Sequence, residues 1–456
     1  MGLFKRLPSS LNPSRLTMGE ISKAATSTAP KVPEAPEPIE VTEQYEEVRK
    51  LIEENHKIIF VTGGAGTGKS TFVRWIEGLH SGKVAIVAPT GIAALTVSGT
   101  TIHRFFLFPP AYVVDTDIKI NPKSVLPKIE ILIIDEISMV NANVLDAIDK
   151  SCQLHRKNKS PFGGLTVIMV GDLFQLPPVV TNSTEPLFRR EYRSPKFFAA
   201  HAFAESEPMG VELSSSFRQK DETLIKLLRC LREGIDLENS VSEFNANCLI
   251  VAKPPIGAVH LAPRNKDVDL INSRELSNLP MPEQIFTAKL SGKFSERHLP
   301  APDKVILRAG AQVVMLHNTK EWVNGNIGVV TEIHGDKVVI KLVDSGRKVE
   351  VRPHEWKNYD YTFNETSKKV ERQVIGTFTQ IPVSLAWAMT IHKSQGLTLD
   401  KVHVDLGAGA FETGQSYVAL SRSRSLETIT LARKLNVDDI LVDKESIDFY
   451  KVIRGE

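Results

Sequence analysis

One short stretch constrains this chain more than any other: the run from Gly63 to Ser70, which reads GGAGTGKS. It follows the apolar run at 58–61 and precedes the apolar-periodic residues 71–76, so we expect the order strand, glycine loop, helix. Glycines let a backbone wrap a polyphosphate with its N–H groups, and a helix N-terminus adds positive potential. The spacing therefore predicts a phosphate-binding loop, in which Lys69 reaches the β- and γ-phosphates and Ser70 ligates Mg²⁺.

Two other interpretations fit this stretch less well. A dinucleotide-binding fingerprint needs a different spacing, because here the glycines alternate with single residues and a lysine follows. A glycine turn that binds no ligand would not require a lysine and a serine directly after its last glycine. We therefore expect the other loop residues to contact the nucleotide as well: Gly64, Ala65, Gly66, Thr67, Gly68 and Thr71.

Composition sets the class of protein but not its partner. The 456 residues are 42% hydrophobic, which is enough for about two to four compact domains of a soluble globular protein. The three cysteines have no metal or disulfide spacing, so we expect reduced thiols and an intracellular protein. No apolar run is long enough to span a bilayer. The net charge is only +2, so a polyanion would need basic and polar groups gathered on one face.

The first forty residues are rich in Pro, Ser and Thr and have almost no hydrophobic period, so we expect them to be disordered. Lys5, Arg6 and Arg15 precede any acidic residue, which leaves a transit peptide open. Ordered structure should begin at Val41, with Thr42 as the cap of a helix.

Two further apolar runs read as parallel strands that end in polar residues. The run 84–88 is followed by Pro89, Thr90 and Gly91 at the start of a helix, and the run 131–134 ends in Asp135 and Glu136. Open α/β sheets bind ligands at the carboxyl ends of their strands. One carboxylate can hold Mg²⁺ and the next can orient or deprotonate the attacking water, although an Asp-Glu pair is often only a solvated turn.

A third apolar strand, 165–170, precedes the sequence GDLFQLPPV at 171–179. Gln175 then follows a strand end, where its amide can report on a γ-phosphate. By itself it would be an ordinary loop glutamine.

Taken together, these motifs resemble a known family. The phosphate loop, the Asp-Glu-Ile-Ser run at 135–138 and GDLFQLPPV occur in the order of the superfamily-one DNA helicases of the Pif (petite integration frequency) type, which are related to the RecD-like and Dda-like enzymes. The segment 161–164, the run 385–398 with IHKSQGLT, and the run GQSYVALSR at 414–422 match further motifs of that family. The resemblance extends from about Gln44 to Arg433.

The resemblance implies roles around the nucleotide. Arg218 and Arg422 would be two arginine fingers that meet the γ-phosphate from the second domain, Glu136 would act on water, and Asp135 with Ser70 would hold the metal. Gln44, Gln395 and Gly396 would complete the nucleotide site. Arg264 departs from the family, which more often has Thr at that position, and we assign it no role.

The resemblance also implies a grip on single-stranded DNA. Hydroxyl, imidazole and ammonium groups can hold a sugar-phosphate backbone without reading bases, and an aromatic ring, here that of Phe105 or Phe106, can stack on a base. The expected backbone contacts are Pro89, Thr90, Gly91, Thr101, His103, His392 and Lys393. The segment 104–128 would be the wedge that separates strands, or else a packed surface loop.

The expected fold is α/β, with two RecA-like parallel-sheet domains. The first would span 41–213 with the insertion 104–128, and the second 214–456. Alternating short strands with glycine turns suggest an inserted barrel at 319–382. By resemblance it would be SH3-like and help to hold single-stranded DNA, while the residues alone fit a purely structural barrel equally well.

We therefore expect a DNA-stimulated ATPase that uses ATP and Mg²⁺, moves along single-stranded DNA and unwinds duplexes at single-strand/duplex junctions. The family implies 5′-to-3′ movement, G-quadruplexes or RNA–DNA hybrids as further substrates, and roles in replication, repair, recombination and telomere maintenance. We expect a monomer without membrane contact, in the bacterial cytoplasm or in a eukaryotic nucleus or mitochondrion. An ATP-gated single-strand binding module that does not unwind, and an RNA-directed helicase, remain as alternatives.

Overall fold

A six-stranded parallel sheet fills the first half of the chain in the computed structural model, which describes residues 39–219, 221–294 and 299–456. Its strand order is β3-β2-β4-β5-β1-β6, and every neighbouring pair is parallel. The strands are β1 (Ile58–Gly63), β2 (Val84–Ala88), β3 (Thr100–Thr101), β4 (Ile131–Ile134), β5 (Thr166–Val170) and β6 (Met209–Leu213). Strands β1, β2, β4 and β5 are buried along their whole length, as expected for continuous apolar runs covered on both faces.

Helices connect these strands. The side chain of Thr42 accepts a hydrogen bond from the Tyr45 N–H at 3.3 Å, so the predicted cap is confirmed. The helices of this half are α1 (Glu43–Glu53), α2 (Lys69–Leu79), α3 (Gly91–Thr96), α4 (Ile102–Phe105), α5 (Ala142–Arg156), α6 (Glu185–Glu191) and α7 (His201–Ala204). The predicted disorder of residues 1–40 lies almost entirely outside the described residues.

A second parallel sheet has the order β19-β8-β20-β21-β7. Its strands are β7 (Leu249–Ile250), β8 (Val259–Ala262), β19 (Ala388–Thr390), β20 (Val402–Val404) and β21 (Ile429–Leu431). The helices of this half are α8 (Glu222–Glu233), α9 (Leu237–Asn247), α10 (Asn265–Ser277), α11 (Ile391–Ser394), α12 (Gln415–Leu420) and α13 (Lys444–Arg454). The chain thus contains the two parallel α/β sheets that its motifs predict.

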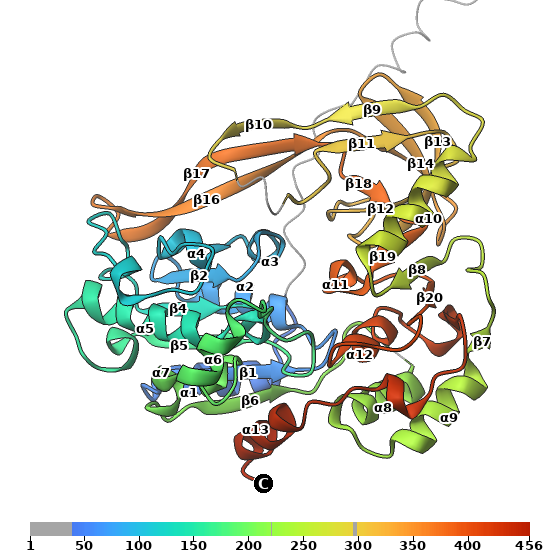
Figure 1. Ribbon diagram of the computed structural model, residues 1–456. Coiled ribbons are helices and arrows are strands. Elements are labelled where there is room, and N and C mark those ends of the chain that lie inside the picture. Colours follow the sequence, from blue (N-terminus) through green and yellow to red (C-terminus); the bar gives the residue numbers. More distant parts are fainter. Residues whose placement is uncertain (1–38, 220, 295–298) are drawn as a thin grey trace, which may run out of the picture. The chain divides into compact units, whose positions relative to one another are not determined.

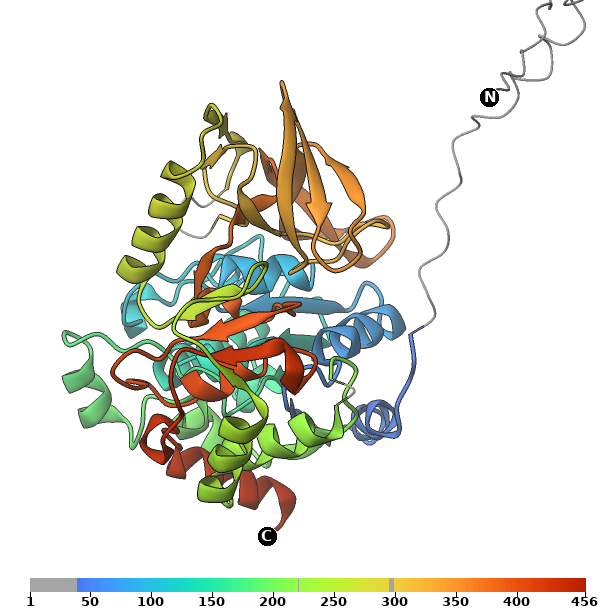
Figure 2. The same cartoon turned by 90° about the vertical axis from the view of Figure 1, so that its right-hand side faces the viewer.

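Antiparallel strands interrupt the second sheet between β8 and β19 (Figures 1 and 2). Five of them pair in the order β15-β14-β13-β12-β18: β12 (Gln312–Met315), β13 (Ile327–His334), β14 (Lys337–Leu342), β15 (Lys348–Val351) and β18 (Val383–Leu385). Five more form smaller sheets: β9 (Gln284–Thr287) with β11 (Lys304–Leu307), and β10 (Lys289–Gly292) with β17 (Lys369–Gln380) and β16 (His354–Asn364). The antiparallel region therefore starts near residue 284, earlier than the predicted 319, and its pairing describes open sheets.

The long hairpin β16–β17 reaches from this antiparallel region to the first sheet, where it lies beside α3, α4 and β2 (Figure 1). The Tyr361 hydroxyl accepts a hydrogen bond from the Ile86 N–H at 2.9 Å, at the edge of β2 beyond the short strand β3. Arg372 forms an ion pair with Glu77 at 2.7 Å. The hairpin thus covers the part of the β2 edge that the two-residue strand β3 does not pair with.

The C-terminal helix α13 also packs on the first sheet, although it follows the second sheet in sequence. The Phe449 ring stacks on the Phe198 ring with centroids 4.4 Å apart, and α13 contacts β6. A Cβ on Gly210 would lie 2.0 Å from Ile453 Cγ2, so this close approach requires a glycine. Residues 444–454 therefore depart from the predicted division at 213/214.

The segment 104–128 starts in the last two residues of α4, has one turn of 3-10 helix at Asp115–Asp117 and is otherwise irregular, and it packs against α5. Asn143 exchanges two hydrogen bonds of 2.8 Å with the backbone of Val113, and the Asn121 N–H donates to His155 Nε2 at 2.8 Å. Arg156 donates to the carbonyls of Leu126 and Ile129. The segment is therefore a packed loop with a fixed path, which is compatible with either expectation for it.

All three cysteines are free thiols, as expected. In the part of the chain that the structure describes, none of the helices has the length and the apolar content needed to cross a bilayer.

Candidate active site

The loop between β1 and α2 has the backbone that a phosphate-binding loop needs. Gly66 and Gly68 have φ of +83° and +85°, which glycine adopts without steric cost. Gly68 also lacks room for a Cβ, which would lie 2.7 Å from the Tyr45 hydroxyl. That hydroxyl donates to the Gly68 carbonyl at 2.8 Å, so α1, with Gln44 in its first turn, abuts the end of the loop.

The Lys69 ammonium lies inside its own loop. It donates to the carbonyls of Gly63 and Gly64 at 2.8 Å and 2.9 Å. Burial lowers the pKa of this ammonium, and the carboxylates of Asp172 and Glu136 oppose the shift. An anion that enters the loop would offer the three donors of Lys69 a stronger acceptor than these neutral carbonyls. Ser70 and Thr71 follow in the first turn of α2.

The two predicted carboxylates lie directly behind β4. Asp135 is 5% exposed, and burial, with the neighbouring Glu136 charge second, raises its pKa to about 7. Burial also raises the pKa of Glu136, and Lys69 opposes that shift. Glu136 has φ of +51°, a left-handed conformation that is uncommon outside glycine and that strained functional sites often contain.

Amides link Glu136 to the GDLFQLPPV loop. Gln395 Nε2 donates to Gln175 Oε1 at 3.0 Å and lies 3.5 Å from Glu136 Oε2. Gln175 Nε2 in turn donates to Asp172 Oδ2 at 3.1 Å. A hydrogen-bonded path therefore runs from the end of β4 through the second sheet's Gln395 and back to the first sheet, and it includes three of the predicted side chains.

The segment 214–219 crosses directly over the phosphate loop. The Phe217 N–H donates to the Gly66 carbonyl at 2.9 Å, and a Cβ on Gly66 would lie 2.3 Å from Arg218 Cβ. Arg218 itself donates to the carbonyls of Gly396 at 3.3 Å and Ser421 at 3.5 Å. Burial lowers the pKa of the Arg218 guanidinium. Arg218 therefore lies beside the loop with both guanidinium branches on backbone of the second sheet's motifs.

Arg422 lies in the same region but is buried, with 1% of its surface exposed. Its Nε donates to the Val418 carbonyl at 2.8 Å, and its Nη1 and Nη2 atoms meet the Ser394 carbonyl and the Ser421 hydroxyl at 3.2 Å and 2.6 Å. Burial, followed by the nearby Arg218 charge, lowers its pKa to about 9. In this conformation Arg422 braces the loop that carries Gln395 and Gly396, and its role as an arginine finger stays a prediction.

Tyr417 is a site residue that motif reasoning missed. Its hydroxyl accepts from the Ala65 N–H of the phosphate loop at 2.9 Å and donates to Asp172 Oδ2 at 3.0 Å. It belongs to the GQSYVALSR run, but the sequence gives no signal that a tyrosine on α12 reaches a loop more than three hundred residues earlier. Asp172, fully buried, was likewise present in a recognised motif without an assigned role.

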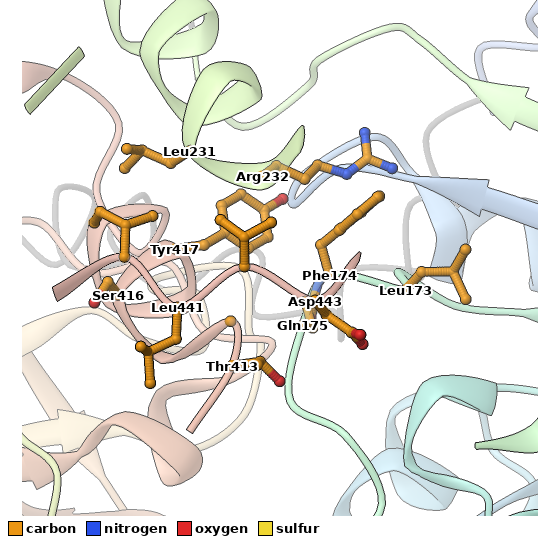
Figure 3. Close-up of a pocket in the computed structure, with 13 residues that line it drawn as sticks. Leu173, Phe174, Gln175, Leu231, Arg232, Thr413, Ser416, Tyr417, Leu441 and Asp443 are labelled. Atoms are coloured by element: carbon orange, nitrogen blue, oxygen red, sulfur yellow. The ribbon is translucent and has the colours of Figure 1, made fainter. Parts of the chain in front are cut away.

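A cavity of about 10 Å³ lies behind the GDLFQLPPV loop (Figure 3). That volume suffices for about one water molecule and excludes a nucleotide. The nucleotide candidate therefore remains the phosphate loop itself, over which Tyr417 and residues 217–219 lie. The cavity is lined by residues 173–175, Leu231, Arg232, 413–414, 416–417 and 440–443.

The candidate DNA contacts fall at the carboxyl ends of strands in both sheets. Pro89, Thr90 and Gly91 follow β2, and the Thr90 hydroxyl accepts from the Ala93 N–H at 3.2 Å as the cap of α3. Thr101 ends β3, and His103 follows in α4. In the second sheet, His392 and Lys393 lie in α11 after β19. Both are exposed, and His392 is 3.0 Å from Glu412 Oε2.

The two candidate stacking rings differ in access. Phe106 is 5% exposed and stacks on Phe108 with centroids 5.3 Å apart, so this candidate is wrong for the described conformation. Phe105 is partly exposed, and its ring meets the Tyr361 ring edge-on at 5.7 Å. Phe106 lies four residues after the buried Ile102, on the same face of α4, and both side chains belong to one hydrophobic cluster.

Comparisons with known proteins agree with this geometry. Residues 40–223 match the family model described as PIF1-like helicase, and residues 362–439 match a model described as Helicase. The ATP-dependent DNA helicase PIF1 of Rattus norvegicus is 35% identical over 416 residues, which are 87% of this chain and 62% of the rat protein. The ATP-dependent DNA helicase Pif1 of Bdellovibrio bacteriovorus is 34% identical over 87% of this chain and 89% of its own.

Solved structures of a bacterial relative have the same fold. Pif1 from Bacteroides sp in complex with ADP-AlF4 is 33% identical and superimposes with a TM-score of 0.85 over 92% of this chain and 98% of that chain. The same protein bound to ssDNA gives a TM-score of 0.66 over the same shares.

Proposed function

The chain belongs to the PIF1-like helicase family, and on that premise we propose that it is an ATP-dependent DNA helicase that moves along single-stranded DNA. One observation carries the proposal: Lys69, Glu136, Gln175, Gln395, Arg218 and Arg422, drawn from both sheets, gather around one phosphate loop. An ATP site formed between two sheets changes as the nucleotide changes. Such a site can therefore move two DNA-binding surfaces relative to each other.

We propose that phosphoryl transfer to water uses four groups. Lys69 and Arg218 stabilise the negative charge that develops on the γ-phosphoryl oxygens, which is where preorganised cations are most effective. Glu136 accepts a proton from the attacking water, and its place directly after β4, beside Gln395 and Gln175, suits that role. Gln175 orients that water through its amide, because it is fixed between Asp172 and Gln395.

Asp135 and Ser70 fit a magnesium site, since both offer the oxygen donors that this ion prefers. Among the described residues, no cluster of three or more His, Cys, Asp or Glu side chains could hold a metal by itself. A metal here would therefore depend on phosphate oxygens and water for its remaining ligands, as is usual for Mg²⁺. When bound with ATP, it would neutralise phosphate charge.

The DNA path that we propose crosses the carboxyl ends of both sheets, from Thr90, Thr101 and His103 to His392 and Lys393. Phe105 replaces Phe106 as the stacking ring. The family resemblance supports 5′-to-3′ movement, a strand-separating role for 104–128, an SH3-like role for the antiparallel region, and a monomer. The division near residue 213 into two RecA-like domains stands as a proposal, with α13 as a return to the first domain. We propose an intracellular place of action, because the substrate is DNA.

A strand-displacement assay tests this function. We expect ATP-dependent displacement of a 5′-tailed DNA duplex and little displacement of a 3′-tailed one, with Lys69→Ala as the inactive control. ATP hydrolysis and single-strand binding without displacement of either duplex would instead favour the ATP-gated single-strand binding module. Faster displacement on RNA tails than on matched DNA tails would favour an RNA-directed helicase.

A further inference from the structure

We propose that Arg232 is a positioning residue for ATP hydrolysis and that the C-terminal helix α13 holds it in place, an inference that rests on the proposed function. Arg232 lies on α8, outside the motifs recognised in the sequence, and only 7% of it is exposed. A buried guanidinium needs partners that offset its desolvation. Its partners come from the GDLFQLPPV loop on one side and from β6 and α13 on the other.

Asp172 is the partner that links Arg232 to the nucleotide site. Arg232 Nε lies 3.3 Å from Asp172 Oδ1, and the other carboxylate oxygen, Oδ2, accepts from Gln175 Nε2 and Tyr417 Oη at 3.1 Å and 3.0 Å. The two oxygens of this fully buried carboxylate therefore bind different partners, Arg232 on one side and the side chains near the phosphate loop on the other. The Phe174 N–H donates to Oδ1 at 3.2 Å and the Arg232 charge lies against the same oxygen, so the two together hold the carboxylate, and with it the positions of Gln175 and Tyr417.

The opposite side of Arg232 is held by groups that are not part of the nucleotide site. Arg232 Nη2 donates to the Tyr450 hydroxyl at 3.2 Å, and Nη1 lies 3.3 Å from Glu212 Oε1. Arg454 binds Glu212 Oε2 at 2.8 Å, with its guanidinium 4.3 Å from the centre of the Tyr450 ring. Helix α13 therefore supplies a hydroxyl to Arg232 directly and a second cation to the carboxylate that Arg232 shares.

Aromatic rings complete the enclosure. The Arg232 guanidinium lies 4.9 Å from the centre of the Phe174 ring and 5.0 Å from that of Tyr450, and Figure 3 shows it beside Phe174 and Tyr417. A planar guanidinium between rings loses little freedom when it forms hydrogen bonds, whereas a buried ion pair by itself is weak evidence for stability. This arrangement favours a role for Arg232 in positioning Asp172 over a role in fold stability alone.

The test compares Arg232→Gln and Tyr450→Phe with Arg229→Gln, a matched change on an exposed face of the same helix. The readouts are kcat and KM for ATP at saturating single-stranded DNA, together with the thermal unfolding midpoint. We expect Arg232→Gln to lower kcat about ten-fold with KM nearly unchanged, because loss of the cation beside Asp172 would loosen the hold on Gln175 without removing a contact to ATP. Tyr450→Phe should lower kcat in the same direction, and Arg229→Gln should match the wild type.

Tyr450→Phe keeps its ring and so decides the matter if Arg232→Gln does not fold. A wild-type kcat in Tyr450→Phe, with only a lower unfolding midpoint, would show that Arg232 and α13 merely stabilise the fold and would overturn the proposal. Absence of DNA-stimulated ATPase activity in the wild type would contradict the proposed function itself. If single-stranded DNA stimulates the ATPase activity of the wild type and of the variants equally, only this inference would be overturned.

Discussion

At the scale of single residues, our proposal gives Lys69 and Glu136 different tasks at the nucleotide site. Lys69→Ala removes the cation that binds the phosphates, so we expect ATP affinity to fall sharply. Glu136→Gln keeps shape and hydrogen-bonding capacity, including the contact with Gln395, while removing the base. We expect Glu136→Gln to bind ATP and to hydrolyse it more slowly than the wild type by a factor of about one hundred or more.

Equilibrium binding of a fluorescent ATP analogue and steady-state ATPase rates separate the two variants. Unchanged turnover in Glu136→Gln would exclude Glu136 as the base. Comparable ATP affinity in Lys69→Ala would show that the inward pose of Lys69, on the carbonyls of Gly63 and Gly64, is its functional pose.

The places of the candidate site residues were predictable from the sequence wherever a motif names the residue and its neighbours in sequence build the local geometry. The phosphate loop, the acid pair after β4 and Gln175 are of this kind. Three residues were not assigned a role from the sequence: Asp172, Tyr417 and Arg232. Their roles depend on contacts with one another, and those contacts join residues far apart in the chain. Phe106 was misassigned because an aromatic pair gives no sign of which ring turns inward.

At the scale of elements, the hairpin β16–β17 acts as cover for the edge of β2. Tyr361→Phe would leave the buried Ile86 N–H without its acceptor, which typically costs about 1–3 kcal/mol. We expect a lower free energy of unfolding with unchanged secondary structure, measured by thermal or denaturant unfolding. Tyr359→Phe, on the same strand, is the matched control and should change little. A stable Tyr361→Phe would mean that the hairpin leaves β2 in solution.

A stacked histidine pair in the antiparallel region predicts a pH dependence of stability. The His317 and His354 rings lie 4.0 Å apart, and burial, with His354 second, lowers the pKa of His317 to about 4. Burial also lowers the pKa of His354, and Glu355 opposes that shift. Between about pH 6.5 and pH 4 the unfolded chain binds a proton on His317 that the folded chain does not, so stability is complete above 6.5 and falls as the pH decreases.

His317→Gln removes this linkage, so the wild type should lose more stability than the variant on acidification. His317 is partly exposed, and we therefore expect only on the order of 1 kcal/mol. Unfolding free energies at pH 7.5, 6 and 5 test this, with His334→Gln on an exposed strand as control. Parallel pH profiles for wild type and His317→Gln would contradict it.

Elements were predictable where hydrophobic period is strong. The buried strands β1, β2, β4 and β5 match their apolar runs, and Thr42 caps α1. The docking of β16–β17 and α13 on the first sheet was not predictable. Both are amphipathic elements whose sequence shows that one face is buried, but not against which sheet.

At the scale of the whole molecule, the two sheets meet through charged and polar groups around the phosphate loop. Arg218 donates to the carbonyls of Gly396 and Ser421, and Gln219 donates to the Ser421 carbonyl at 3.1 Å. These are contacts to backbone that can be exchanged for phosphate oxygens at modest cost. ATP and DNA can therefore favour the same closed arrangement, and each would shift the population towards it.

We predict that single-stranded DNA strongly stimulates ATP hydrolysis and that Arg218 transmits most of this effect. An arginine that reaches a transferring phosphoryl group is typically worth about 10³ to 10⁵ in turnover, so Arg218→Ala should lose most of the stimulated rate while keeping DNA affinity in the absence of nucleotide. Arg218→Lys should recover little, since an ammonium lacks the planar fork that meets two oxygens at once.

Arg422→Ala should also lose activity, but together with stability, because its guanidinium is buried on the carbonyls of Val418 and Ser394. Steady-state ATPase rates with and without a single-stranded oligomer, combined with unfolding midpoints, distinguish the two arginines, and the exposed Arg274→Ala serves as control. If Arg218→Ala is stimulated like the wild type, Arg218 does not act on the phosphate, and the coupling between the sheets must pass through Arg422 and Gln395 instead.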